Sequence, residues 1–196
     1  VSSAASDVYK RQIHNMLHVS GGDKELATKL ARRSFLYYGL YLIDFLRFTS
    51  ASREELLRRV GFDDWAVLDE ARDGNGMLFV TIHFGNWDLG AAALLDHGYP
   101  VSVIADRFSD PRLNKLVLAS RRHIGMKILP SERSGLSLMR VLRRNELVAA
   151  LIDIPDRKSG VEVEFFNGTI RVPDGLARLA LYSKAAVVVG TVPRIG

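Results

Sequence analysis

Hydrophobic and polar positions divide the chain into two unlike parts. Residues 24–48 have the periodicity of a long helix, and the capping-box spacing of Ser52 and Glu55 predicts a short helix directly after it. From residue 77 onward, short β-rich apolar runs alternate with helical stretches. The expected strands are 77–82, 101–105, 126–129, 147–152, 161–166 and 186–192, and the expected helices are 87–97, 111–124, 134–144 and 174–184.

This alternation predicts an α/β fold, a mostly parallel, twisted sheet covered by helices and preceded by a helical segment. We expect a helical region over residues 13–75 and an α/β domain over residues 76–196. Residues 1–12 show no periodic pattern and resemble translated sequencing-adapter read-through, so we expect them to be non-native or disordered. Because no closing helix follows the last strand, we expect the α/β domain to be truncated at its C-terminus.

The long N-terminal helix is unusually aromatic. The stretch FLYYGLYLIDFLRF, residues 35–48, holds 6 of the chain's 17 aromatic residues. Asp44 and Arg47 interrupt it, so it cannot span a bilayer. Two interpretations remain open, since the aromatic side chains can pack on the domain core or can lie at a membrane interface. We therefore expect the helical segment to associate with a membrane, and it can also pack on the domain.

Composition narrows the class of protein. The 196 residues are 47% hydrophobic and 25% charged, which is typical of a globular domain and excludes a disordered or coiled-coil chain. The absence of cysteine excludes disulfide scaffolds, zinc fingers, iron–sulfur sites and cysteine nucleophiles. The net charge of +5 favours an anionic partner, such as a membrane, a nucleic acid or a phosphorylated cofactor.

Two function classes fit the sequence poorly. A nucleic-acid-binding surface interleaves basic and aromatic residues, whereas here the aromatics cluster in one helix and the basic pairs are scattered, so we expect no nucleic acid partner. A metal hydrolase would need ligands at a defined spacing, and His83, Asp88 and Asp96 do not form one. We therefore expect no metal ion.

The strongest candidate site follows the first expected strand. That strand ends directly before residues 83–88, HFGNWD, and ligands of open α/β sheets bind at the carboxyl ends of the strands. On a continuous helix His83 and Asp88 would lie roughly 140° apart, but a turn at Gly85 lets Asp88, in the first helical turn, meet the ring. A carboxylate there would hold the imidazole in the tautomer that a general base requires. A hydrogen-bonded structural histidine is the alternative.

Three segments resemble one family in order and spacing. The stretch IHFGNWDLGAAALL contains an H-x-x-x-x-D motif similar to that of the glycerolipid and lysophospholipid acyltransferase superfamily, most of all the branch of lipid A late acyltransferases and phosphatidylinositol mannoside acyltransferases. The later segments are ADRFSDPRLNKLVLASRRHIGMKILP and LIDIPDRKSGVEVEFFNGTIRVPDGLARLALYSKAAVVVGTVPR. The resemblance covers about residues 24–194.

The resemblance implies an acyltransferase. It would move a fatty acyl chain from acyl-CoA or acyl carrier protein to a hydroxyl of a membrane glycolipid or lysophospholipid, with His83 as general base and Asp88 holding the ring. No cofactor beyond that co-substrate is expected. The resemblance also implies a peripheral protein on the anionic, cytoplasmic face of the bacterial inner membrane. A non-catalytic lipid- or membrane-binding relative is the alternative, and the intact His83 and Asp88 argue against it.

Further site residues are expected from the same resemblance. Glu162 and Glu164 share one side of a strand, in the region where the mannoside branch has a glutamate that assists the catalytic histidine. Either can fill that role, and a solvent-facing strand edge is the alternative for both. We expect Asn86 to bind substrate. We also expect Arg107 and Arg171 to bind phosphates of the acceptor head group or of the carrier, since a guanidinium group suits a phosphate.

Two more groups of residues are placed by sequence alone. Arg121 and Arg122 belong to a basic helix, and we expect them on a solvated or membrane-facing surface. Asp153 and Asp156 flank a loop that could reach the site, and a structural role is an equally good interpretation.

Overall fold

The computed structural model describes residues 3–62, 64–105, 107–130, 134–154 and 160–195. Its helices are α1 (Ser3–Val19), α2 (Lys24–Arg47), α3 (Arg53–Leu57), α4 (Ala66–Ala71), α5 (Trp87–Asp96), α6 (Pro111–His123), α7 (Ser134–Leu142) and α8 (Gly175–Ser183). Its strands are β1 (Met77–Thr81), β2 (Val101–Ala105), β3 (Lys127–Pro130), β4 (Leu147–Leu151), β5 (Val161–Phe165), β6 (Gly168–Val172) and β7 (Ala186–Val189).

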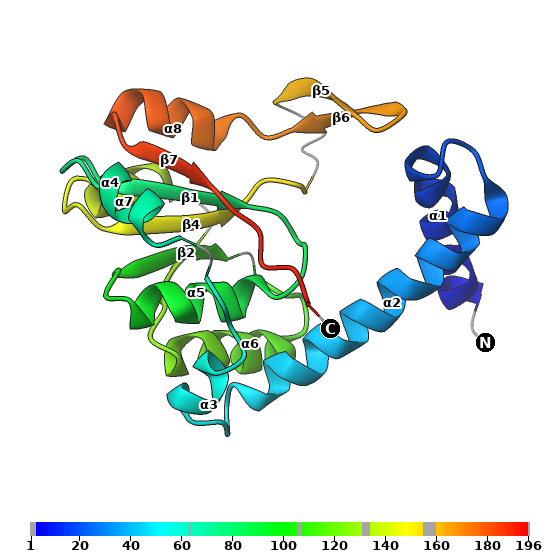
Figure 1. The fold of residues 1–196 in the computed structure, drawn as a ribbon, viewed down its shortest axis with the longest axis horizontal. Coiled ribbons are helices and arrows are strands. Elements are labelled where there is room, and N and C mark those ends of the chain that lie inside the picture. Colours follow the sequence, from blue (N-terminus) through cyan, green and yellow to red (C-terminus); the bar gives the residue numbers. More distant parts are fainter. Residues whose placement is uncertain (1–2, 63, 106, 131–133, 155–159, 196) are drawn as a thin grey trace.

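Five of these strands form one parallel sheet in the order β3-β2-β4-β1-β7. The carboxyl ends of β1, β4 and β7 all lie at the right-hand edge of the sheet in Figure 1. Because parallel strands need crossover connections, helices cover both faces of the sheet. The expected α/β fold with a mostly parallel sheet is confirmed.

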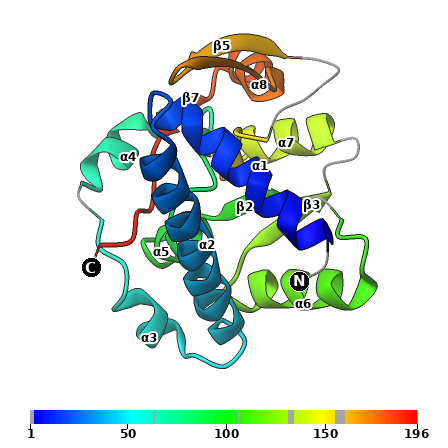
Figure 2. The ribbon, with the colours of Figure 1, turned by 90° about the vertical axis from the view of Figure 1, so that its right-hand side faces the viewer.

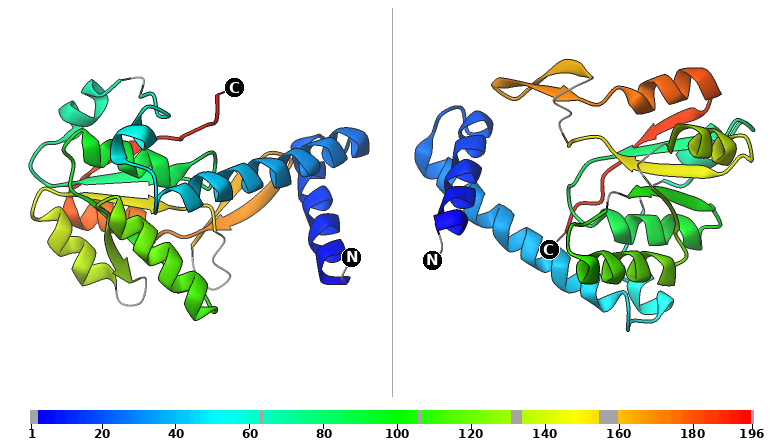
Figure 3. Two further views of the ribbon diagram at one scale, coloured as in Figure 1. Left: turned by 90° about the horizontal axis from the view of Figure 1, so that it is seen from below. Right: turned by 180° about the vertical axis from the view of Figure 1, so that it is seen from behind.

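The two faces of the sheet are packed by different helices. On one face, Met77 and Phe79 of β1 contact a buried cluster that includes Leu68 of α4 and Leu94 of α5. On the other face, the alternate β1 residues pack with α7 and α8, and Leu142 is fully buried there. Apolar side chains on both faces of β1 are what a central strand of a helix-covered sheet requires. Figure 3 shows the same layers from below and from behind.

Helix α2 joins the domain through its C-terminal half. Tyr41, Phe45 and Phe48 recur at helical spacing and pack with Leu56 of α3 and Leu89 of α5. The expected helix over residues 24–48 and the Ser52 capping box are confirmed. The N-terminal half of α2 extends away from the sheet and carries α1 (Figures 1 and 2). Within the described residues no helix combines the length and the apolar character that crossing a bilayer demands.

Residues 3–12, which we expected to be non-native or disordered, belong to helix α1. Tyr9 packs on Phe35 with ring centroids 5.9 Å apart, and the Gln12 side chain donates to the Ser34 hydroxyl at 3.0 Å. One aromatic and one polar contact thus hold α1 against α2, and neither gives α1 a clear hydrophobic pattern in the sequence.

One expected strand is not part of the main sheet. Residues 161–165 form β5, which pairs antiparallel with β6 in a separate hairpin. Four of the five β5 residues are exposed, whereas a strand of the main sheet must be apolar on both faces. Strand β6 and the short helix α4 were not expected. The Asn-Gly pair at 167–168 between two β-rich runs was an available hairpin signal.

Candidate active site

The parallel sheet has a topological switch point between β1 and β4. These strands are neighbours, with Thr81 paired to Leu151, yet the chain leaves them toward opposite faces, into α5 after β1 and toward the hairpin and α8 after β4. Ligands of open α/β sheets bind outside the carboxyl ends of strands at such a point. His83 and Asp153 each lie two residues beyond that last pair, so the register itself brings them together.

The side chain of Asp153 holds His83 by two hydrogen bonds. Its Oδ2 accepts from the His83 backbone N–H at 3.0 Å, and its Oδ1 lies 2.8 Å from the ring Nδ1. A carboxylate can only accept, so Nδ1 carries the proton and the lone pair of Nε2 is available. The imidazole is 36% exposed, which leaves Nε2 within reach of a second molecule. A strand-end histidine in this state has the arrangement of a general base.

Asp88 does not orient the histidine ring, contrary to expectation. Its carboxylate is 2% exposed and accepts from Arg121 Nε at 2.7 Å and Nη2 at 3.2 Å, and from the Tyr41 hydroxyl at 2.8 Å. Helix α5 turns Asp88 inward toward α2 and α6, away from the strand-end loops. Asp88 therefore ties three helices together.

The Asp88 cluster also shows that Arg121 is not a surface residue. Its side chain is 15% exposed, so our expectation of a solvated or membrane-facing position was wrong. Burial by itself lowers the pKa of Arg121, but the adjacent Asp88 carboxylate outweighs it and the pKa is raised. Burial, reinforced by the Asp88 charge, raises the pKa of Tyr41 as well, so the phenol stays a neutral donor.

The turn after His83 is formed against the C-terminal segment 190–195. Gly85 has φ +73°, and a Cβ atom there would lie 1.6 Å from the Val192 carbonyl oxygen, so only glycine fits. The same oxygen accepts from the Asn86 backbone N–H at 2.9 Å. The Asn86 side chain begins α5 by accepting from the Leu89 N–H at 3.0 Å. Segment 190–195 therefore fixes the path of the HFGNWD turn.

A cavity of about 680 Å³ lies behind this turn. Its walls come from the sheet, from α4 and α5 and from segment 190–195, and its volume is within the range of about 300–1,000 Å³ typical of small-molecule pockets. Much of the wall is apolar, including Leu68, Phe79, Leu94, Val103, Ala149 and Val188. Thr81, Asn86 and Trp87 line it as well, and its charged lining residues are Asp44, Arg59, Asp64, Asp88, Arg121 and Arg194. Such a cavity suits a long apolar ligand with a polar end.

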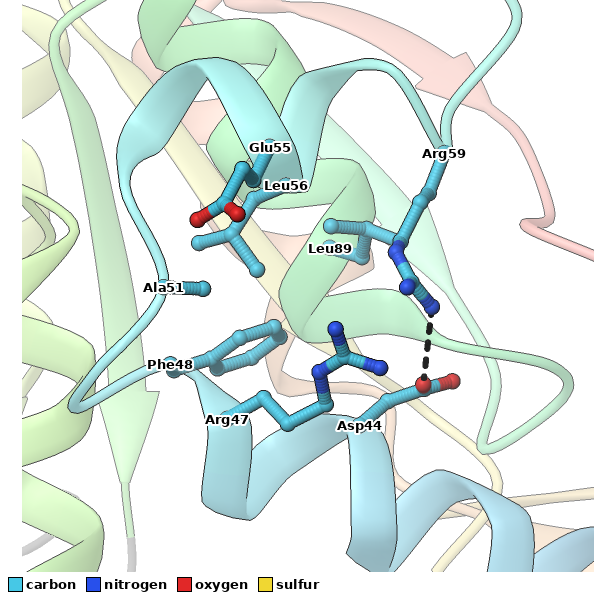
Figure 4. Close-up of a pocket in the computed structure, with 8 residues that line it drawn as sticks. All are labelled: Asp44, Arg47, Phe48, Ala51, Glu55, Leu56, Arg59 and Leu89. Atoms are coloured by element: carbon cyan, nitrogen blue, oxygen red, sulfur yellow. Dashed lines mark ion pairs between the residues drawn. The ribbon is translucent and has the colours of Figure 1, made fainter.

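A second cavity, of about 10 Å³, lies where α2 meets α3 (Figure 4). It has room for about one water molecule. Asp44 and Arg59, whose charged groups lie 3.8 Å apart, line both this cavity and the larger one. The small cavity is a packing gap at a helix junction.

Glu162 and Glu164 are not brought to the histidine. Both lie on the exposed hairpin strand β5, where Glu162 Oε1 accepts from Arg171 Nη2 of β6 at 2.6 Å. The carboxylate that contacts His83 comes from Asp153 instead. Glutamates on an antiparallel hairpin outside the main sheet have no register with β1, which explains the difference.

The expected substrate-binding residues have three different environments. Asn86 is buried in the turn, and Arg171 is paired across the hairpin. Arg107 is exposed just beyond β2, at the same edge of the sheet as His83. Asp156 lies outside the described residues.

A family model now decides the affiliation of the chain. The model of the bacterial lipid A biosynthesis acyltransferases matches residues 2–195. The chain belongs to this family. The resemblance found in the HFGNWD motif and the two later segments is thereby confirmed.

Two curated relatives of this acyltransferase chain are named phosphatidylinositol mannoside acyltransferases. The protein of Mycolicibacterium smegmatis is 27% identical over 166 residues, covering 81% of this chain and 54% of the relative. The protein of Mycobacterium tuberculosis is 28% identical over 193 residues, covering 86% of this chain and 60% of the relative. The chain thus spans little more than half the length of these relatives.

Some site residues of this family member were not assigned a role from sequence. Tyr41 lies within the aromatic stretch of α2 and has no motif of its own, and its role depends on the docking of α2. Val192 acts through its backbone carbonyl, which leaves no side-chain signal. Asp153 had a usable signal, because it follows the end of β4 by the same two residues as His83 follows β1.

Proposed function

We propose that the protein transfers a fatty acyl chain from an acyl thioester, acyl-CoA or acyl carrier protein, to a hydroxyl of a membrane glycolipid. The observation that carries this proposal is the 2.8 Å contact of Asp153 with the Nδ1 of His83 at the carboxyl edge of the sheet. Membership of the acyltransferase family and the names of the mycobacterial relatives support the reaction class.

In the proposed reaction His83 acts as general base. Nε2 takes the proton of the acceptor hydroxyl as its oxygen bonds to the thioester carbonyl carbon. The C–S bond then breaks, and the leaving thiolate takes that proton from the imidazolium. Asp153 stabilises the transient imidazolium, because its carboxylate accepts from Nδ1 throughout. No covalent enzyme intermediate is required.

The large cavity supports a long acyl chain as the transferred group. Its volume of about 680 Å³ and its apolar wall suit an alkyl chain, whose burial is favourable by about 0.8 kcal/mol per CH₂. Arg107, exposed at the same edge, is positioned to contact a phosphate of the donor or of the acceptor head group. Leu36 and Ile43 of α2, which are 61% and 58% exposed, support peripheral contact with a membrane, which we propose to be the cytoplasmic face of the inner membrane.

The decisive experiment compares His83→Gln and Asp153→Asn with the parent protein. Each protein receives a bacterial glycolipid extract and a donor with a labelled acyl chain, either acyl-CoA or acylated acyl carrier protein. The amount of labelled lipid product is then measured. We expect His83→Gln to lower the rate by about 10²–10⁴-fold, the range of general-base assistance. Asp153→Asn keeps an acceptor for Nδ1 but removes the charge, so we expect a loss in the same direction.

The control is Asp174→Asn. Asp174 lies between β6 and α8, and its carboxylate accepts from Arg178 of α8 instead of from the histidine. Its rate should match the parent. Unchanged acyl transfer in His83→Gln would contradict the proposal and favour the non-catalytic, lipid-binding alternative.

A further inference from the structure

Three buried polar atoms beside His83 have no hydrogen-bond partner among the described residues. They are Thr81 Oγ1, Asn86 Nδ2 and Trp87 Nε1. Thr81 is 6% exposed and Asn86 is 8% exposed. Buried donors are almost always paired in native proteins, because an unpaired one loses its bond to water without replacement. Three such atoms in one short region therefore point to a ligand group that pairs with them.

All three residues line the large cavity, and each lies within four residues of His83 along the chain. Thr81 shares one face of β1 with Met77 and Phe79, as alternate residues of a strand do, but it is the last and the polar member of that row. The Trp87 ring lies 4.8 Å from the His83 ring, measured between centroids. The rest of the wall combines apolar side chains such as Phe79 with charged ones such as Asp64 and Arg121.

The three atoms also share a chemistry, since each can donate a hydrogen bond. The Asn86 amide is held by its own Oδ1, which accepts from the Leu89 N–H, and this leaves Nδ2 as the unused donor. The Trp87 ring is stacked on Tyr41 with centroids 4.2 Å apart, which fixes the direction of its N–H. Donors on the wall of a cavity with large apolar patches suit an apolar chain that carries an oxygen acceptor.

We propose that Asn86 Nδ2 and Trp87 Nε1, assisted by the Thr81 hydroxyl, bind the carbonyl oxygen of the acyl donor and stabilise the oxyanion that forms on it. This inference rests on the proposed acyl transfer. When the acceptor oxygen bonds to the carbonyl carbon, the C=O π-electron pair moves onto the carbonyl oxygen, where the three donors face it. The pair returns as the C–S bond breaks. Donors placed for the developing charge lower the barrier to the reaction.

Near-isosteric variants can remove each donor with little change of shape. Trp87→Phe keeps an aromatic ring on Tyr41, Asn86→Asp keeps the oxygen that begins α5, and Thr81→Val replaces the hydroxyl by a methyl group. We expect Trp87→Phe and Asn86→Asp to lower kcat by roughly 10²–10³-fold, the usual effect of losing one oxyanion donor. The KM of the acyl donor should rise by a much smaller factor than kcat falls, because the contact exists in the ground state but is strongest in the transition state.

Thermal unfolding separates this role from a structural one. Removing an unpaired hydroxyl relieves its desolvation cost, so Thr81→Val should unfold at the same or a higher Tm while losing activity. The matched control is Ser102→Ala, because Ser102 Oγ is also buried without a partner among the described residues but does not line the cavity. Ser102→Ala should likewise hold or raise Tm, with kcat unchanged.

Binding without turnover provides the second readout. Calorimetry compares palmitoyl-CoA with S-hexadecyl-CoA, a thioether that lacks the carbonyl oxygen. We expect the parent to prefer the thioester and Trp87→Phe to lose that preference. The inference would be overturned if the kcat of Trp87→Phe stayed within about twofold of the parent and the variant still preferred the thioester. The three donors would then bind only a buried water molecule. A preference that persists in the parent without any acyl transfer would instead contradict the proposed function alone.

Discussion

The buried carboxylate of Asp88 is balanced by one guanidinium among the described residues, that of Arg121. Removing one partner of a buried ion pair leaves the other charge uncompensated, which costs about 3–5 kcal/mol. We therefore expect Asp88→Ala to lower the free energy of unfolding by that amount, measured by urea unfolding followed through tryptophan fluorescence. The double variant Asp88→Ala with Arg121→Met should recover part of the loss, since no buried charge then remains.

The matched control is Glu54→Ala, which breaks the exposed Glu54–Arg58 pair. Exposed pairs are worth about 0–1 kcal/mol, so this variant should unfold close to the parent. A loss below about 1 kcal/mol in Asp88→Ala would contradict the structural role of the carboxylate.

At the scale of single residues, sequence singled out His83 but paired it with Asp88, and it gave Asp153 only a possible place near the site. His83 was predictable because it ends an apolar strand and opens a glycine turn. Its partner depends on which strand lies next to β1, and that neighbour, β4, is about 70 residues distant along the chain. Asp88 was expected at the ring because the motif spacing permits it. The inward turn of α5 instead buries Asp88 against Arg121.

At the scale of elements, α2 presents an apolar outer face that nothing in the described chain covers. Leu36, Ile43 and Leu46, which fall within about 80° of one another around the helix, are each more than half exposed. The basic residues Lys24, Lys29, Arg32 and Arg33 of the same helix add attraction to anionic lipid. The two interpretations of the aromatic stretch are therefore compatible, because Tyr41 and Phe45 pack inward while other members face outward.

We expect α2 to bind vesicles that contain phosphatidylglycerol. Burying two large apolar side chains at the interface favours binding by more than 1.4 kcal/mol, so Leu36→Glu with Ile43→Glu should weaken co-sedimentation by at least about tenfold. The control is Leu181→Glu, because Leu181 is 81% exposed and belongs to α8, a helix on the opposite side of the molecule from α2 (Figure 1). Equal binding by the double variant and the parent would refute membrane contact through α2.

Regular elements with strong patterns were predictable, and isolated ones were not. The strands of the main sheet are apolar on both faces, so their sequence reflects burial directly. The hairpin strands β5 and β6 are mostly exposed, so their sequences carry no clear burial pattern, and only the Asn-Gly pair marks their turn. Helix α4 has six residues, too few for a periodic pattern to be read.

At the scale of the whole molecule, one chain of contacts joins α2 to the HFGNWD turn. Asp44 of α2 is paired with Arg194, which lies two residues after Val192. The Val192 carbonyl in turn accepts from the Asn86 N–H, and Val192 forms an isolated parallel β-bridge with Gly85. No sequence pattern marks this link, because segment 190–195 forms an isolated bridge and has no side-chain periodicity. It forms only after α2, the sheet and the turn have all been assembled.

This chain of contacts makes a prediction for Asp44→Asn. The variant removes the charge between Arg194 and Arg59, so segment 190–195 loses its attachment to α2 and the Asn86 N–H opens more often. Hydrogen–deuterium exchange of a peptide covering residues 82–90 should therefore be faster than in the parent.

The control is Asp96→Asn, which breaks the Arg53–Asp96 pair whose side chains are 58% and 51% exposed. Such an exposed pair contributes about 0–1 kcal/mol, so exchange should stay at the parent rate. Unchanged exchange in Asp44→Asn would mean that segment 190–195 holds the turn without help from α2, and an equal increase in both variants would point to general loosening of the helices.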